Sequence, residues 1–172
     1  MPEQANRMYS EGVIASGSIR LLALAPLVFL AHFVEEAFGF LDWFNALVEP
    51  DMAPRTFYVV NGFALAVTAL LAAAAIRWRD HNLGLVLIAW LSFLMLTNGA
   101  LHITASFMFA EYVPGAITSV VLYLPFFVFA VVTICREFEV QPRAAMIAAA
   151  IGAVPMVLQG VSVLADGHRL LW

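Results

Sequence analysis

The chain has 172 residues, of which 63% are hydrophobic and only 12% are charged. Soluble domains are about 45–50% apolar and about 25% charged, so one water-soluble core of this size cannot hide this apolar excess. The composition predicts an integral membrane protein that forms a single helical-bundle domain over residues 1–172. All eight basic residues are arginines without a basic stripe, which argues against nucleic acid as a partner.

Five apolar stretches follow a mixed, polar N-terminal segment, residues 1–19. Each stretch has about the length that a helix needs to cross the hydrocarbon core of a bilayer. We therefore expect an all-α polytopic bundle of five transmembrane helices joined by short connectors. The expected spans are residues 21–41, 56–76, 83–109, 113–135 and 144–165.

The arginines set the expected orientation, because Lys and Arg are enriched at the cytoplasmic ends of membrane spans. Six of them fall on one side of the expected bundle, namely Arg7, Arg20, Arg77, Arg79, Arg136 and Arg143, and only Arg55 and Arg169 fall on the other. The N-terminus is therefore expected inside and the C-terminus outside.

Small residues and prolines mark the last two spans. Pro125 and Pro155 predict kinks, which membrane helices tolerate because neighbours and waters satisfy the freed carbonyl. The alanines around Gly152 give the fifth span a face for close helix packing. That face is expected to pack within the chain or in a homodimer, and the sequence does not decide between the two.

Three ionisable residues lie within about one turn of the first span: His32, Glu35 and Glu36. On a helix, His32 and Glu36 stand almost in line and Glu35 lies on the adjoining flank, so all three can face one spot. Buried charges in a membrane are costly and usually functional. We expect a functional site here, with a purely structural role as the plainer alternative.

The third span carries a polar stripe at helical spacing, made of Asn98, His102 and Ser106. Such a stripe can simply tie helices together by hydrogen bonds. Polar residues of three other spans fall at about the depth of Glu36 and His102, namely Asn61, Thr118 and Gln159. We expect one cavity in the outer half of the membrane, in which Asn61 and Thr118 contact a bound cofactor.

No arginine is placed to neutralise the two glutamates, because the sequence has none between residues 20 and 55 or between 79 and 136. A metal, a proton or an imidazolium must then supply the positive charge. One divalent cation with two neutral imidazoles and two carboxylates sums to zero, the cheapest state in a low dielectric. We predict that His32, Glu36 and His102 bind one metal ion, with zinc favoured and iron as the alternative.

Glu35, Glu36 and Asn98 are the expected catalytic residues. A glutamate that does not ligate the metal can act as general base toward a metal-bound water, whose pKa falls to about 7. Sequence does not assign the two glutamates to these roles. The favoured function is a hydrolase in the lipid bilayer acting on a hydrophobic small molecule, lipid-like or isoprenoid.

Three alternatives to a metal-dependent hydrolase stay open. An iron site would carry out oxygen chemistry as a non-haem oxidoreductase. A metal-free site would catalyse isomerisation or cyclisation, with one of the two carboxyl groups kept protonated. A non-catalytic protein would bind an ion, a proton or a cofactor in the same cavity.

These motifs together resemble one family. Four features carry the resemblance: the string at residues 32–36 in the first span, an asparagine in the second, Asn98-x-x-x-His102 in the third and Pro114-Gly115 at the start of the fourth. Together they are similar to the HXXEE-motif family of small bacterial membrane proteins. The resemblance runs from the first span to the fourth. It implies an enzyme-like site in the bacterial cytoplasmic membrane and names no substrate.

Overall fold

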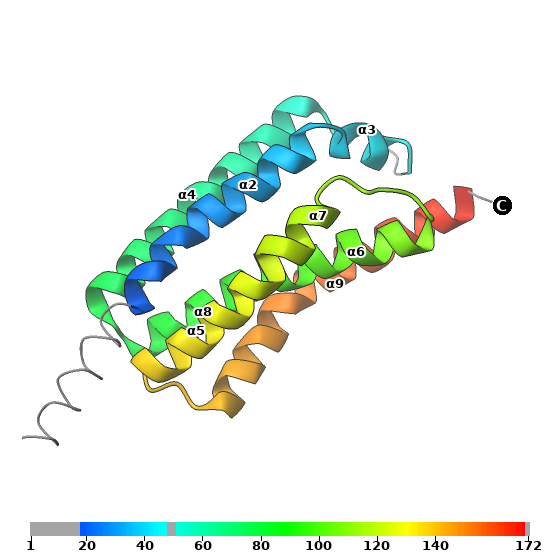
Figure 1. Ribbon diagram of the computed structural model, residues 1–172. Helices are drawn as coiled ribbons and strands as arrows, with labels where there is room; N and C mark the ends of the chain where they lie inside the picture. Colours follow the sequence, from blue (N-terminus) through cyan, green and yellow to red (C-terminus); the bar gives the residue numbers. More distant parts are fainter. Residues whose placement is uncertain (1–17, 48–50, 171–172) are drawn as a thin grey trace, which may run out of the picture.

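The computed structural model describes residues 18–47 and 51–170, and of residues 164–170 the backbone alone. The described chain is helical without a strand, and five of its helices are long and apolar enough to cross a membrane. Figure 1 shows these helices packed as a bundle. They are Ser18–Ala37, Pro54–Trp78, His81–Met108, Ala116–Glu137 and Pro142–Val163. The predicted five-helix membrane bundle is confirmed, whereas residues 1–17 of the polar N-terminal segment lie outside the described residues.

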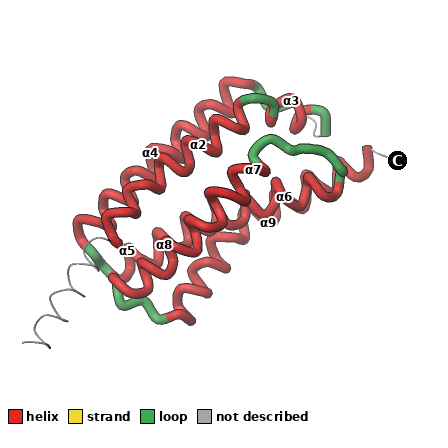
Figure 2. The backbone as a smooth tube through the Cα atoms, viewed as in Figure 1, coloured by secondary structure: helices red, strands yellow, loops and turns green. Residues whose placement is uncertain are grey.

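Figure 2 shows the helices and the loops that join them, and three of the spans are built from more than one helical segment. The first span joins the 3₁₀ turn η1 (Leu21–Leu24) to α2 (Ala25–Ala37), and the short α3 (Phe40–Asn45) follows it. The second span is α4 (Pro54–Trp78) and the fifth is α9 (Pro142–Leu170). The third joins α5 (His81–Leu91), η2 (Ser92–Thr97) and α6 (Asn98–Met108). The fourth joins α7 (Ala116–Thr118), η3 (Ser119–Tyr123) and α8 (Leu124–Glu137).

The helices begin at residues that suit a helix N-terminus. Pro54 and Pro142 are the first residues of α4 and α9, where the missing N–H of proline has no intrahelical acceptor to lose. The Asp80 side chain caps α5 by accepting a hydrogen bond of 3.0 Å from the Leu83 N–H. The second and third spans are thus joined by Arg79 and Asp80 alone.

Two wide turns of π-helix, η2 and η3, interrupt the third and fourth spans. In η2 the Thr97 hydroxyl donates to the Ser92 carbonyl at 2.8 Å. Segment η3 ends two residues before Pro125, which cannot donate to the carbonyl of the preceding turn. A π turn thus lies just before Pro125, where a kink was expected. The extra residue in each π turn changes the direction of the side chains that follow it.

Two predicted span boundaries are wrong, and a glycine explains each. The first span ends at Ala37 instead of residue 41, because Gly39 has φ +155° and separates α2 from α3. The fourth begins at Ala116 instead of residue 113, because Gly115 has φ +102° and ends a loop. Both values lie in the region that favours glycine. Glu36 consequently lies in the last turn of α2, closer to the helix end than expected.

The small-residue face of α9 packs against α5 within the chain. A Cβ atom added at Gly152 would lie 2.0 Å from the Ala89 carbonyl oxygen, so the two helices approach as closely as a glycine allows. Pro155 lies inside this helix. The homodimer stays a prediction.

Large apolar side chains point out of the bundle, as expected for helices in lipid. Leu70, Phe63 and Ile151 are 70%, 68% and 65% exposed. Most arginines that the structure describes lie at one end of the bundle: Arg20, Arg77, Arg79, Arg136 and Arg143. Arg55 lies in the first turn of α4 at the other end, and the orientation of the termini stays a prediction.

Candidate functional site

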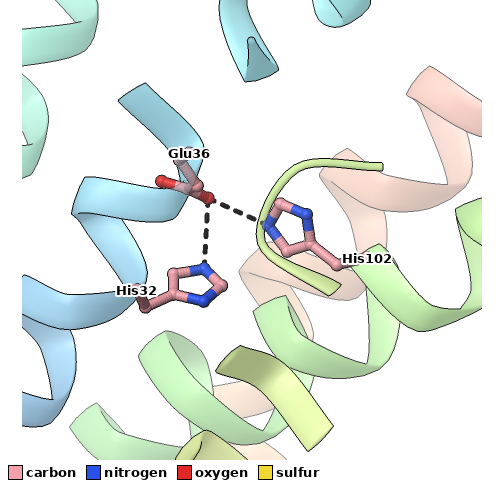
Figure 3. Close-up of side chains that lie close together, drawn as sticks. All are labelled: His32, Glu36 and His102. Atoms are coloured by element: carbon pink, nitrogen blue, oxygen red, sulfur yellow. Dashed lines mark hydrogen bonds and ion pairs between the residues drawn. The ribbon is translucent and has the colours of Figure 1, made fainter. Parts of the chain in front are cut away.

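His32, Glu36 and His102 meet between α2 and α6. Figure 3 shows Glu36 and His32 on one helix and His102 reaching toward them from another. Oε1 of Glu36 lies 3.2 Å from Nε2 of His32 and 2.9 Å from Nε2 of His102. The three residues are buried, with 0%, 6% and 3% of their surfaces exposed. One ligand atom from each lies within 4.8 Å of the others, so the structure brings together the three predicted metal ligands.

Thr118 fixes the orientation of His32. Its Oγ1 lies 2.8 Å from Nδ1 of His32 and 3.3 Å from the Gly115 carbonyl oxygen. A hydroxyl both donates and accepts, so Thr118 serves either tautomer of the ring. When Nε2–H donates to Glu36, Nδ1 accepts from Thr118; when Nε2 holds a metal, Nδ1–H donates to Thr118, which donates to Gly115. The second pattern is the usual support of a metal-bound histidine.

Glu35 points away from the two histidines and toward the start of α7. It accepts hydrogen bonds from the Tyr112 hydroxyl, from the Ile117 N–H at 3.1 Å and from the Thr118 N–H at 2.7 Å. These amides begin a helical span, where free N–H groups favour a negative charge. The expectation that only a metal, a proton or an imidazolium could compensate this glutamate is therefore wrong.

Tyr112 lies in the connector between the third and fourth spans and is 54% exposed. Its partial burial, and then its hydrogen bond to Glu35, raise the pKa of Tyr112 to about 12. The phenol therefore stays protonated at neutral pH and remains a donor to the carboxylate. Sequence reasoning missed this contact, because a tyrosine in a connector has no distinctive pattern.

The Pro114–Gly115 turn lies directly against the two imidazoles. A Cβ atom at Gly115 would be 2.7 Å from Cε1 and 2.8 Å from Nδ1 of His102, and 3.0 Å from Cε1 of His32. Nδ1 of His102 is buried and has no hydrogen-bond partner in the described part of the chain. Glycine is thus required here both by its φ and by the space that the rings occupy.

Tyr123 forms the other wall of the His32 ring. The two rings stack with centroids 3.9 Å apart, and Tyr123 is fully buried. Its hydroxyl has no hydrogen-bond partner among residues 18–47 and 51–163. The sequence assigned this residue no role, because a tyrosine in an apolar helix is typical of core filling, and the π turn of η3 that sets its direction has no clear signal.

The remaining predicted residues differ in their positions. Asn98 belongs to the cluster, since its Nδ2 lies 3.2 Å from Nε2 of His32. Asn61 is half-buried on α4 and donates to the Phe57 carbonyl of its own helix at 3.1 Å, which is no link to the cluster. Ser106 accepts from the Val113 N–H at 3.2 Å and so supports the loop before α7. The roles predicted for Asn61 and Thr118 toward a cofactor stay predictions.

A cavity of about 80 Å³ lies beside His102, between α3, α6 and α9. Aromatic side chains of α3 form one wall, and the Phe40 ring lies 5.3 Å from the His102 ring. Asn98 and Gln159 supply amide groups to the lining. Trp43 also lines it and donates to Glu111 at 2.7 Å, which ties α3 to the loop before α7. Of the polar layer expected from sequence, His102 and Gln159 line this cavity, whereas Glu36, Asn61 and Thr118 do not.

One family model matches the chain. It describes a protein of unknown function with an HXXEE motif, and it covers residues 23–130. No curated protein and no solved structure matches the chain. The matched region contains the histidines, the glutamates and Thr118, and it ends before α9, which completes the cavity.

Proposed function

The chain belongs to the HXXEE-motif family, whose function is unknown, and we propose that this member is a membrane enzyme with one divalent metal ion held by His32, Glu36 and His102. The supporting observation is that three buried ligand atoms lie within 4.8 Å of one another. Two imidazoles and one carboxylate leave a fourth position open, as in catalytic zinc sites. Zinc is the favoured metal, and iron is the alternative for the same ligand set.

Charge balance also supports a cation. The recorded partners of the Glu36 carboxylate are the two imidazoles, with no arginine among them in the described chain. A buried carboxylate without a cation is costly. A divalent ion held by two neutral imidazoles would offset the charge of Glu36, the one carboxylate that contacts both histidines. Such an ion would supply Lewis acidity and an acidified water.

The two glutamates receive different roles in this proposal. Glu36 is the ligand, since its Oε1 faces both histidines. Glu35 is a positioning residue, because three donors already occupy it and one of them is the Thr118 amide beside His32. Asn98 lies at the cavity and near Nε2 of His32, so we assign it the binding of the reacting group.

Hydrolysis of a lipid-like molecule is the reaction that fits this site best, because His102, one of the three proposed ligands, lines a mainly apolar cavity. A second candidate is metal-free acid/base catalysis. The observation in its favour is that Glu36 already bridges two histidines through hydrogen bonds. In that case a proton shared within the His32–Glu36–His102 cluster would move during isomerisation of a lipid-embedded double bond.

Metal analysis tests the proposal directly. Detergent-purified wild type, His32→Ala and His102→Ala are compared by elemental analysis after zinc and iron are supplied in turn, with His81→Ala as matched control. His81 is exposed at the start of α5. We expect about one metal ion per chain in wild type and control, and its loss in both other variants. A wild type that takes up neither metal would overturn the metal site and leave acid/base catalysis.

A second experiment tests the reaction. Uncharged lipid esters are offered to the metal-loaded protein before and after treatment with a chelator, and Glu36→Gln serves as the variant without a ligand carboxylate. Hydrolysis that stops on metal removal and returns with added zinc supports the hydrolase. Full activity of the metal-free protein would refute it.

The site lies at the end of the bundle away from most described arginines. Glu36 lies in the last turn of α2, whereas Arg77, Arg136 and Arg143 lie at the ends of their spans on the opposite side of the bundle. By the positive-inside rule this arrangement supports our proposal that the site lies near the outer face of a bacterial cytoplasmic membrane. A tag at the C-terminus that is accessible from outside intact cells would support this topology, and a tag accessible only from inside would reverse it.

A further inference from the structure

We propose that the cavity between α3, α6 and α9 binds the uncharged, hydrogen-bonding end of a single-chain amphiphile, such as the glycerol ester of a monoacylglycerol, and that Gln159 recognises it. The inference rests on the proposed function, because it places the bound ester beside His102. It adds the substrate class and a recognition residue on α9, which lies outside the matched region of the family.

The size of the cavity selects a small group. Its volume is about 80 Å³, roughly half of the ~150 Å³ of an engineered cavity that binds one benzene molecule. A few heavy atoms fill this space, so the rest of a hydrophobic ligand must lie outside it. The neighbouring surfaces of α6 and α9 are apolar and exposed, with Phe107, Leu158 and Val161 at 83%, 65% and 60%. An acyl chain can lie along them in the lipid.

Among the residues whose side chains the structure describes, the lining contains no group that would bind an anionic head group. His102 is the only ionisable side chain of this described lining, and the polar side chains beside it are the amides of Asn98 and Gln159 and the Trp43 indole, which donates to Glu111. Phosphate and carboxylate need charge-assisted donors such as arginine when they leave water, and Glu36 lies 2.9 Å from His102. The aromatic wall would suit a quaternary ammonium, but a metal ion at His102 would repel it. An uncharged ester or hydroxyl needs no charge-assisted donor, and a metal ion at His102 would not repel it.

Gln159 is the residue whose placement calls for such a ligand. It lies in the membrane-spanning part of α9, is exposed, and lines the cavity. In the described part of the protein no hydrogen bond is recorded for its amide. A primary amide without a hydrogen-bond partner is unfavourable in an apolar environment. A carbonyl or hydroxyl of a bound ligand can satisfy it, since an amide both donates and accepts.

The test is photolabelling with a diazirine-bearing monoacylglycerol, followed by peptide mass spectrometry. Gln159→Leu removes the amide, and Val163→Trp narrows the cavity at a half-buried residue of its lining. Gln141→Leu is the matched control, because Gln141 is exposed just before the other end of α9. We expect labels on the lining of the cavity, a loss of about tenfold or more in the first two variants, and no change in the control. Unlabelled monoacylglycerol should compete, whereas lysophosphatidate and an alkyl-trimethylammonium of equal chain length should not.

Each other outcome is informative. Equal competition by either charged amphiphile, or labelling that is indifferent to Gln159→Leu, overturns the inference. Metal content measured on the same samples separates it from the proposed function and shows that Val163→Trp still folds. A metal-loaded protein that the probe does not label in the cavity overturns this inference alone. Gln159-dependent labelling of a protein that binds no metal overturns the metal proposal and supports the cavity.

Discussion

Replacing Gly115 with alanine should damage the proposed metal site more than it damages the fold. The positive φ of +102° makes alanine unfavourable by about 1–3 kcal/mol. The added Cβ would also lie 2.8 Å from Nδ1 of His102, about 0.7 Å closer than the ~3.5 Å of an ordinary contact. Either the turn or the ring must move by several tenths of an ångström. Disturbed support of a metal-bound histidine typically lowers metal affinity 10–100-fold, and we expect a loss of that size.

The variant Gly39→Ala separates the effect of backbone strain from the effect of displacing the His102 ring. Its φ of +155° also disfavours alanine, but its Cβ would meet only Pro114, at an ordinary 3.4 Å. Zinc affinity is measured for both variants by competition with a chromophoric chelator, and stability by thermal unfolding of the zinc-free proteins. We expect both variants to lose stability and only Gly115→Ala to lose affinity. Wild-type zinc affinity in Gly115→Ala would refute the argument that this turn positions the histidines.

Three further changes test other parts of the structure. Thr118→Val should lower zinc affinity about tenfold, because it removes the hydroxyl partner of His32, a proposed ligand. Thr118→Ser keeps a hydroxyl and should restore the affinity in the same competition assay. Equal zinc affinity of the two variants would contradict this role of Thr118. Gly152→Ala should destabilise the bundle by about 1–3 kcal/mol, because its Cβ would lie 2.0 Å from a backbone oxygen of α5. Gly62→Ala is the control: its Cβ would have nothing within 4 Å, so the change should be neutral or stabilising by up to about 1 kcal/mol. Thermal unfolding that ranks the two variants the other way would show that the helices do not pack this closely. Ultraviolet titration should show a tyrosine with a pKa of about 12 that Tyr112→Phe removes and that moves toward 10 in Glu35→Gln. Because the pKa of Tyr112 is raised in the folded protein, the contribution of the Tyr112–Glu35 hydrogen bond to stability is fully present below about pH 10 and is lost as the pH rises through about 12. If Tyr112 titrates near 10 in the wild type, the hydrogen bond is absent.

The number and type of the helices could be predicted from sequence, because an apolar stretch of bilayer length has few other folded forms. The ends of two spans could not. Hydropathy continues across Gly39, where the backbone turns, and it already rises at Val113, where the loop before α7 still runs. The backbone angles of a glycine depend on its tertiary neighbours, and one of these is the pair of imidazoles against Gly115.

The three central side chains were also predictable. His32 and Glu36 are four residues apart on one helix, and the depth of His102 in its own span matched theirs. The partners of Glu35 could not be found in this way, since two of them are backbone amides that any residue supplies. Tyr123 was missed for a related reason, because the π turn that directs it toward His32 has no sequence signature comparable to a charge in a membrane span.

Thr118 connects two places that differ in their access to water. Its hydroxyl contacts the buried His32, and its backbone amide contacts Glu35, which also binds Tyr112 in the connector. The His32 ring inside the bundle and the Tyr112 phenol in the connector are thereby joined through only two residues, Thr118 and Glu35. We therefore expect a fluorophore placed in that connector to respond to a change at the histidines from outside the membrane-spanning helices.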